Sequence, residues 1–142
     1  MAGNLVDDPT IADASLLLRR IPAQRDVHIV WDNNLKRWRP SSQIFRNSRD
    51  NTLAISVNLK QVLDELNLPP ESVLLDPTRY ALASIPAALV RARHQVIQRN
   101  ALDDDPSHAH VLGDKPKPVQ TALAEACAWL IPPPGWPWPD KE

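Results

Sequence analysis

The stretch TLAISVNLKQVLDELN, residues 52–67, changes its hydrophobic period within one uninterrupted segment. Its first apolar side chains alternate along the chain, as in a strand with one buried face, and are Leu53, Ile55 and Val57. Its later apolar side chains recur at helical spacing and are Leu59, Val62, Leu63 and Leu66. We therefore predict a strand over 52–57 and then a helix over 59–66, whose first turn Asn58 caps. A chain built from such units mixes strands and helices.

Other apolar segments around this one are also short and end at turn-forming residues. An apolar element over 15–21 is closed by Pro22. Patterns typical of strands predict further extended segments over 27–31, 41–45, 80–85, 95–99 and 108–112. Because polar turns separate the extended segments within 27–57, we expect an antiparallel meander there.

Two later segments predict helices. Pro86 stands at the first turn of a helix over 86–93, and Pro118 opens the clearest helix of the chain. The apolar stripe of that last helix consists of Val119, Leu123, Ala126, Cys127 and Leu130. Strands and helices follow no regular βαβ order, so the expected fold class is α+β. We predict a small mixed or antiparallel sheet of short strands with two to three helices packed on it.

The same boundaries predict one folded unit between two terminal segments. Residues 1–10 are expected to form a flexible N-terminal arm and residues 11–131 a single α+β domain. Residues 132–142 are rich in proline and tryptophan and predict an extended, polyproline-like C-terminal tail. A length of 142 residues with 43% hydrophobic side chains is enough for one buried core. Fifteen prolines against three glycines favour short elements and stiff loops.

Charge is distributed unevenly along a chain whose net charge is −1. Residues 1–50 carry eight basic and six acidic side chains, whereas residues 101–142 carry three and seven. A protein that binds DNA without specificity would show a strong basic excess. The balance argues against that class and leaves room for a local basic site.

Cysteine content and hydropathy indicate the compartment. Cys127 is the single cysteine, so the chain has neither a disulfide framework nor a cysteine-rich zinc site. The first residues lack the charged and apolar segments of a secretory signal. No apolar run approaches the roughly 20 residues that cross a bilayer. We expect a cytoplasmic protein without a membrane partner.

The stretch DDDPSHAHVLGDK, residues 103–115, places two histidines after a run of aspartates. If 108–112 is a strand, His108 and His110 point to the same face and are candidate metal ligands. A third ligand would come from the set Asp103, Asp104, Asp105, His28 and His94. In the alternative interpretation, His108 orders the acidic loop and His110 lies on the surface. Two histidines at one spacing are a weak motif, so we predict no metal and no cofactor.

The stretch WDNNLKRWRPSSQIFRNSR, residues 31–49, combines cations, hydroxyls and indole rings. The candidate anion ligands are Arg39 with Lys36 or Arg37, followed by Ser41 and Ser42. The candidate stacking rings are Trp31 and Trp38. This set fits a nucleotide or RNA contact. The alternative is a hairpin whose arginine-rich edge faces solvent and blocks pairing between sheets.

The C-terminal sequence GWPWP, residues 135–139, interleaves two tryptophans with prolines. Rigid aromatic faces of this kind make a good docking peptide. Alternatively, Trp136 and Trp138 fold back and cover an apolar patch of the domain, because exposed tryptophans favour aggregation.

Motifs of common catalytic sites do not accompany these segments. Ser41 and Ser42 lack a G-x-S-x-G setting. Cys127 lies within an apolar stripe, where a free cysteine is usually a small buried hydrophobe. The three glycines form no phosphate-cradling loop. These observations favour a protein that is not an enzyme and leave the question open.

Four short motifs of the chain resemble those of a family of short bacterial cytoplasmic proteins to which no activity is assigned. They read LLRRIP, RPSSQIF, LAISVNL and DDPSHAHVLG in this sequence. The family pattern has Leu-Ser-Val-Asp and Asn-Pro-x-His where this chain reads Ile-Ser-Val-Asn and Asp-Pro-Ser-His, and His110 falls outside it. The resemblance spans about residues 16–113. It implies no reaction and singles out Arg20, Arg39, Ser41, Ser42 and His108 as positions to test.

Three functions follow from these segments. The first is an interaction or regulatory protein that acts through another bacterial protein. It would dock by the 31–49 edge or by the tail, and its anchors would be Trp38, Arg39 and Trp136. The second is an enzyme acting on a nucleotide or nucleic-acid phosphate or ribose. The third is a binder of single-stranded nucleic acid that uses the Trp/Arg edge.

The enzyme hypothesis makes a geometric demand. Arg39 would bind the anion with Lys36, Ser41 and Ser42 would orient it, and His108 would act as general acid or base. All of these side chains must then lie in one pocket.

Overall fold

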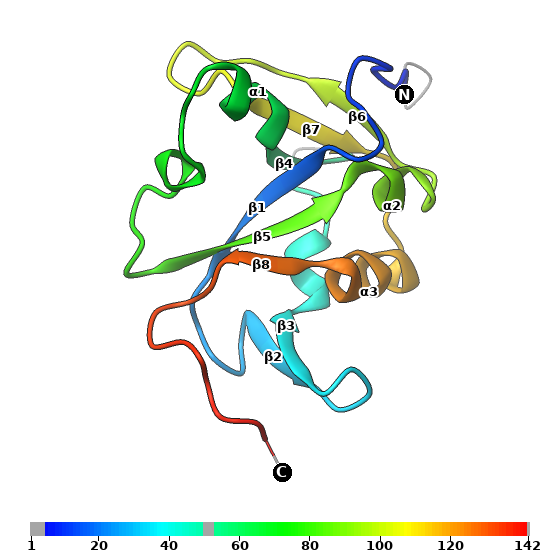
Figure 1. The fold of residues 1–142 in the computed structure, drawn as a ribbon. Helices are drawn as coiled ribbons and strands as arrows, with labels where there is room; N and C mark the ends of the chain where they lie inside the picture. Colours follow the sequence, from blue (N-terminus) through cyan, green and yellow to red (C-terminus); the bar gives the residue numbers. More distant parts are fainter. Residues whose placement is uncertain (1–4, 50–52, 142) are drawn as a thin grey trace.

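The computed structural model describes residues 5–49 and 53–141, and within them six antiparallel strands form the main sheet (Figure 1). In spatial order they are β6 (Val96–Arg99), β7 (His108–Leu112), β4 (Ala54–Leu59), β1 (Leu16–Pro22), β5 (Tyr80–Pro86) and β8 (Ala128–Ile131). A separate antiparallel hairpin consists of β2 (Ile29–Asp32) and β3 (Arg37–Pro40).

The described residues also form three α-helices and two 3-10 helices. These are α1 (Lys60–Glu65), α2 (Ala87–Arg91), α3 (Lys117–Ala126), η1 (Ser42–Phe45) and η2 (Pro70–Val73). The structure confirms the α+β class and the antiparallel sheet with helices packed on it.

The sheet carries a hydrophobic core on each face. The larger core joins strand residues such as Leu17 and Ile85 to side chains of α2, α3, η1 and the β2–β3 hairpin. The smaller core joins Leu18 to Leu63 of α1 and Val73 of η2. Because side chains alternate along a strand, β1 supplies both cores, with Leu17 and Ile21 buried on one face and Leu18 on the other.

β1 pairs unequally with its two neighbours. It pairs with β5 along its whole length, Leu16–Pro22. With β4 it pairs at Leu17 and Leu18, opposite Leu59 and Asn58. Beyond Leu18 the two strands separate, so the second half of β1 has a strand partner on the β5 side alone.

The predicted strand over 52–57 is confirmed as β4, with Thr52 outside the described residues, but the predicted cap is wrong. Asn58 belongs to β4, and α1 begins after Leu59 without a side-chain cap. The Asn58 amide nitrogen instead donates to Asp105 Oδ1 at 2.8 Å and to Ser107 Oγ at 2.9 Å. Long-range partners therefore orient the Asn58 side chain, and it does not cap the first turn of α1.

Within the predicted extended segment 41–45, Ser41 is extended but residues 42–45 form the 3-10 helix η1. Ser41 N still donates to His28 O at 2.8 Å, which continues the hairpin by one residue, and the chain then turns to bury Phe45. The predicted meander is wrong beyond the β2–β3 hairpin, because β4 pairs with β1 and β7 in the main sheet. A segment of four residues is too short to show a hydrophobic period.

The last helix ends earlier than its apolar stripe predicts. α3 ends at Ala126, Cys127 is extended, and Ala128 pairs with Ser84 of β5 as the start of β8. Apolar residues at Cys127 and Leu130 suit a helix or a strand equally well, and pairing with the open edge of β5 decides between them.

Residues 5–10 lie against β6. Asp8 N donates to Ile97 O at 2.9 Å, and Ile97 N donates to the Asp7 carboxylate at 2.9 Å. Arg91 of α2 pairs with the same Asp7 carboxylate at 3.1 Å. Residues 1–4 of the predicted N-terminal arm lie outside the described residues.

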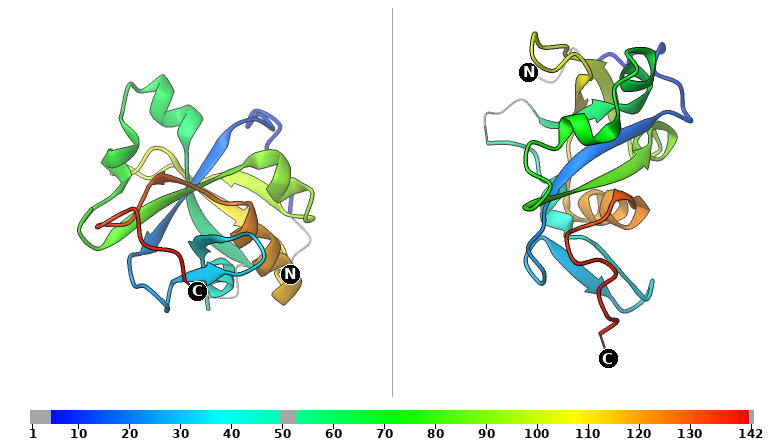
Figure 2. Two further views of the ribbon diagram at one scale, coloured as in Figure 1. Left: turned by 60° about the horizontal axis from the view of Figure 1, so that its bottom comes forward. Right: turned by 60° about the vertical axis from the view of Figure 1, so that its left-hand side comes forward.

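The C-terminal segment 132–141 runs back beside the hairpin (Figure 2). There it completes a cluster of all five tryptophans. Neighbouring rings in the cluster have centroids 5.3 to 6.2 Å apart. The linked residues are Trp31, Trp38, Trp138, Trp136 and Trp129. Glu142 lies outside the described residues.

Trp38 is the centre of this cluster and is 3% exposed. Its indole N–H donates to Pro139 O at 3.1 Å, and the Trp138 ring packs edge-on against it. The Arg25 guanidinium lies 4.3 Å from the Trp138 ring centroid and 5.7 Å from that of Trp38. The tail therefore covers Trp38, as the second interpretation of GWPWP expects.

We predict that Trp138→Ala lowers the free energy of unfolding by about 3 kcal/mol, because a buried tryptophan loses its packing and a cavity remains. Trp136→Ala is the matched control and should lower it less, because Trp136 is 36% exposed. Urea unfolding followed by circular dichroism measures both. Equal losses in the two variants would contradict the packed tail.

Asp32 organises the turn between β2 and β3. Its Oδ1 accepts from the backbone N–H groups of Asn34 and Leu35, each at 2.8 Å. Its Oδ2 accepts from Arg39 Nε at 2.7 Å, and the carboxylate is buried. The hydrogen bond from Arg39 holds the pKa of Asp32 below its ordinary 3.8.

Asp32→Asn should lower the free energy of unfolding by about 1–3 kcal/mol at pH 7, because a buried charge-assisted hydrogen bond is lost. A carboxyl with a depressed folded-state pKa stabilises the fold above pH 3.8 and loses that contribution as the pH falls through the folded-state pKa. The gap between wild type and variant should therefore narrow below about pH 4. Urea titrations at several pH values measure it, and a constant gap would refute this account.

Candidate functional site

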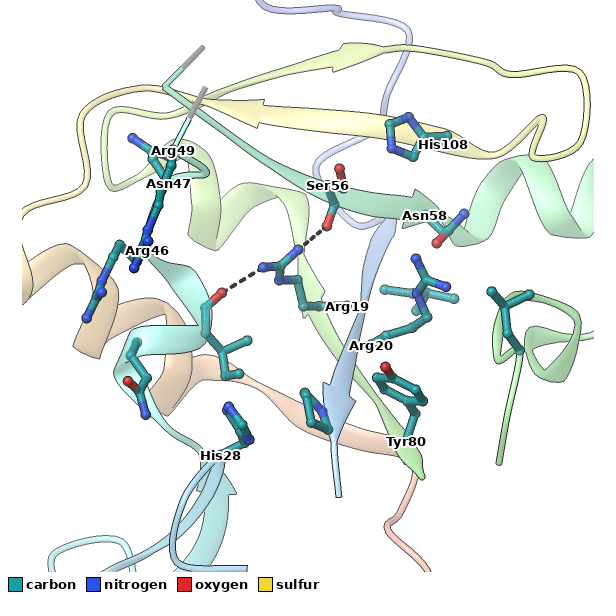
Figure 3. Close-up of a pocket in the computed structure, with 15 residues that line it drawn as sticks. Arg19, Arg20, His28, Arg46, Asn47, Arg49, Ser56, Asn58, Tyr80 and His108 are labelled. Carbon is teal, nitrogen blue, oxygen red and sulfur yellow. Dashed lines mark hydrogen bonds between the residues drawn. The ribbon is translucent and has the colours of Figure 1, made fainter. Parts of the chain in front are cut away.

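A pocket of about 500 Å³ opens where β1 and β4 separate (Figure 3). Its walls come from β1, β4, β7, the segment that follows β3, and the start of β5. The lining side chains that carry charge or hydrogen-bonding groups include Arg19, Arg20, His28, Arg46, Arg49, Ser56, Asn58, Tyr80 and His108. The divergence of two strands thus creates a concave polar surface beside the sheet.

Positive charge is concentrated in this pocket. Four arginines and two histidines line it, and no aspartate or glutamate does so within residues 5–49 and 53–141. Elsewhere, arginines pair with aspartates, as Arg39 does with Asp32 and Arg99 with Asp8. The four pocket arginines form no ion pair with other described residues. The acid held next to the pocket wall is Asp105, which accepts from Asn58.

Arg19 closes the opening between the strands. Its Nη1 donates to Ser56 O of β4 at 2.7 Å and its Nη2 donates to Ile44 O of η1 at 2.8 Å (Figure 3). Its Nε is buried and has no hydrogen-bond partner among the described residues. Burial lowers the pKa of Arg19 to about 10, so the guanidinium remains charged at neutral pH. A fixed cation therefore forms part of the pocket wall.

Lys115 holds in place the part of the pocket wall that carries Arg46 and Arg49. Its ammonium is buried and donates to Asn47 Oδ1 at 2.5 Å and to the carbonyl oxygens of Leu53, Val111 and Gly113, each at 3.0 Å. Burial lowers the pKa of Lys115 to about 8. These bonds tie both flanks of the segment between Asn47 and Leu53 to the end of β7, which fixes the wall that carries Arg46 and Arg49.

His108 lies on the wall formed by β7. Its Nδ1 is 3.1 Å from both Asn100 O and Asn100 Oδ1. Its ring lies edge-on to that of His110, with centroids 5.1 Å apart, so the two histidines share a face as predicted. Within the described residues no group of three His, Cys, Asp or Glu side chains is placed to hold a metal ion.

The structure brings some predicted site residues into the pocket and leaves others outside. Arg20 and His108 line it. Arg39 pairs with Asp32, and the buried Ser42 hydroxyl is 3.0 Å from Thr121 Oγ1 of α3. Ser41 is half-buried at the start of η1. Arg39, Ser41 and Ser42, which the enzyme hypothesis places in one pocket with His108, therefore do not line the pocket that His108 lines.

Sequence reasoning missed the larger part of this pocket. The residues it did not select are Arg19, Arg46, Arg49, Asn58 and Tyr80. One signal was available: Arg19 follows three leucines in a strand-like segment, and a charge between apolar residues calls for a buried partner.

Comparison with protein-family models, curated proteins and solved structures finds no match for this chain. The resemblance to a bacterial family therefore stays a prediction. Among the described residues, no helix has the length and apolar character needed to cross a membrane.

Arg19→Lys should lower the free energy of unfolding by about 1–3 kcal/mol, because an ammonium cannot span two separated carbonyl oxygens as a guanidinium does. Arg20→Lys is the matched control, because Arg20 is the exposed neighbour on the same strand and should leave stability unchanged. Chemical unfolding followed by tryptophan fluorescence tests both. Arg19 would lose its proposed bridging role if the two variants were equally stable.

Proposed function

We propose that the pocket between β1 and β4 binds a phosphate-bearing ligand of nucleotide size. One observation carries the proposal: four arginines without acidic partners among the described residues converge on a concave pocket of about 500 Å³. Unpaired guanidinium groups match phosphate oxygens in charge and geometry. A pocket of this volume lies in the range that encloses small ligands and cofactors.

The lining residues would contribute to binding in different ways. Arg20, Arg46 and Arg49 are exposed and would donate to the phosphate oxygens. Arg19 is committed to two carbonyl oxygens and would contribute its charge rather than new hydrogen bonds. The rings of Tyr80 and the histidines offer faces on which a base can stack.

This proposal concerns binding rather than catalysis. The cations and rings of the pocket supply recognition, whereas Arg39 and Ser42 make their contacts elsewhere. Docking on a partner protein through the Trp/Arg edge has less support, because Trp38 is covered by the tail. A nucleotide ligand also agrees with the cytoplasmic location that the sequence predicts.

The test is isothermal titration calorimetry with a nucleoside triphosphate and with inorganic pyrophosphate at low salt. We expect binding of the triphosphate, weakened about 10-fold or more by Arg20→Ala or Arg46→Ala, because each removes charge-assisted hydrogen bonds. Arg93→Ala is the control, since Arg93 is exposed and does not line the pocket. Undetectable binding of both probes at millimolar concentration, or equal affinity in all variants, would refute the proposal.

A further inference from the structure

The side-chain amide of Asn58 has a fixed orientation in the pocket wall. Its nitrogen donates one hydrogen to Asp105 Oδ1 at 2.8 Å and the other to Ser107 Oγ at 2.9 Å, so both of its hydrogens are used. Turning the amide over would place its oxygen against the Asp105 carboxylate, which accepts hydrogen bonds and does not donate them. The oxygen is therefore the atom that faces Arg20 and the pocket (Figure 3).

This oxygen is a free acceptor in a pocket whose arginines only donate. No donor among residues 5–49 and 53–141 forms a hydrogen bond with Asn58 Oδ1. The other asparagine of the wall, Asn47, accepts from Lys115 and donates to Gly113 O. Covering an acceptor with a ligand that brings no donor costs free energy. A ligand that fills this pocket should therefore carry a hydrogen-bond donor as well as negative charge.

The strand register places a cationic donor near this acceptor. Asn58 of β4 pairs with Leu18 of β1, and Arg20 lies two residues further along β1, so the three side chains share one face of the sheet. Figure 3 shows the end of the Arg20 side chain pointing toward Asn58. Arg20 is exposed and forms no ion pair with other described residues. This end of the pocket thus offers a fixed acceptor and an uncommitted donor together.

A hydroxyl group matches this combination, because it can donate to Asn58 Oδ1 and accept from Arg20 at the same time. The exocyclic amino group of a base can donate but does not accept, since its lone pair is delocalised into the ring. Beside Arg20 it would leave one donor facing another. In a nucleotide, the hydroxyls belong to the ribose. Arginine has five N–H donors, enough for a phosphate oxygen and a hydroxyl oxygen together.

We propose that Asn58 is a specificity-determining residue that accepts a hydrogen bond from a ribose hydroxyl. The pocket then prefers ribonucleotides to nucleotides that lack the sugar hydroxyls. Asp105 and Ser107 are positioning residues, because they hold the amide nitrogen and leave the oxygen for the sugar. This inference rests on the proposed function, because it takes the pocket as a nucleotide site.

The experiment compares adenosine triphosphate with dideoxyadenosine triphosphate, which lacks both ribose hydroxyls, in the same calorimetric titration. We expect the wild-type protein to bind the ribonucleotide about 10-fold more tightly, because the analogue leaves Asn58 Oδ1 without a donor. Asn58→Ala should remove this preference. The ratio of the two affinities reports the contact even if the variant binds both ligands more weakly. Equal affinities in the wild-type protein would overturn the inference.

Asn34→Ala is the matched control, because Asn34 is exposed and does not line the pocket. This variant should keep the full preference. If Asn58→Ala keeps it as well, Asn58 does not bind the sugar and the inference is overturned. If Asn58→Ala does not fold, Asp105→Ala takes its place, since Asp105 lies outside the pocket lining and orients the Asn58 amide. An unchanged preference in Asp105→Ala would then contradict the inference.

Inosine triphosphate, in which the amino group of adenine is replaced, should bind as tightly as adenosine triphosphate. A loss of affinity with inosine but not with the dideoxy compound would assign the contact to the base and overturn the inference. If both adenosine compounds bind equally well and depend on Arg20, the sugar preference fails and the pocket proposal stands. If no nucleotide binds, both fail.

Discussion

The guanidinium of Arg19 lies where two strands of the sheet part. β1 and β4 pair at only two positions, and Arg19 replaces the missing strand contact with hydrogen bonds to Ser56 O and Ile44 O. The bonds join the sheet to η1 and hold the opening apart at a fixed width. Desolvation of the guanidinium opposes this arrangement, as the lowered pKa of Arg19 shows, and the two carbonyl oxygens offset it. The pocket therefore follows from the way that the sheet is completed.

The second constraint on the structure is that acidic and basic side chains are separated in space. The net charge of −1 does not reveal this separation. Acidic side chains are used structurally: Asp32 orders the hairpin, Asp7 and Asp8 hold the N-terminal segment on α2 and β6, and Asp105 holds Asn58. The pocket cations have no such partners among the described residues. Besides burial, the charge of Arg19 lowers the pKa of Lys115, and the charge of Arg20 lowers the pKa of Arg19. An anionic ligand would relieve this repulsion, which is the physical reason for expecting one.

The fold was predictable where the hydrophobic period was long enough to show. The predicted segments at 27–31, 80–85, 95–99 and 108–112 contain β2, β5, β6 and β7 or most of their residues. Asn58, residues 41–45 and residues 127–131 were misassigned because a distant partner decided each of them: Asp105, the buried site of Phe45, and the edge of β5. The pocket was harder to predict for the same reason. Arg20 and His108 were identified, whereas Arg46 and Arg49 become neighbours of Arg19 only through long-range pairing of β1, β4 and β7.

Trp38 and Arg39 differ from the arginines of the pocket in how far they are already engaged within the fold. Trp38 and Arg39 are engaged within the fold: Arg39 is bound to Asp32, and the tail lies over Trp38 beside the guanidinium of Arg25. A partner could reach Trp38 only by displacing the tail, and this would break aromatic contacts and an indole hydrogen bond together. The arginines beside β4 need no such displacement, because Arg20, Arg46 and Arg49 are already exposed. We therefore place the proposed ligand site on the side of the sheet where the strands part, whereas the tryptophans pack in or against the larger core.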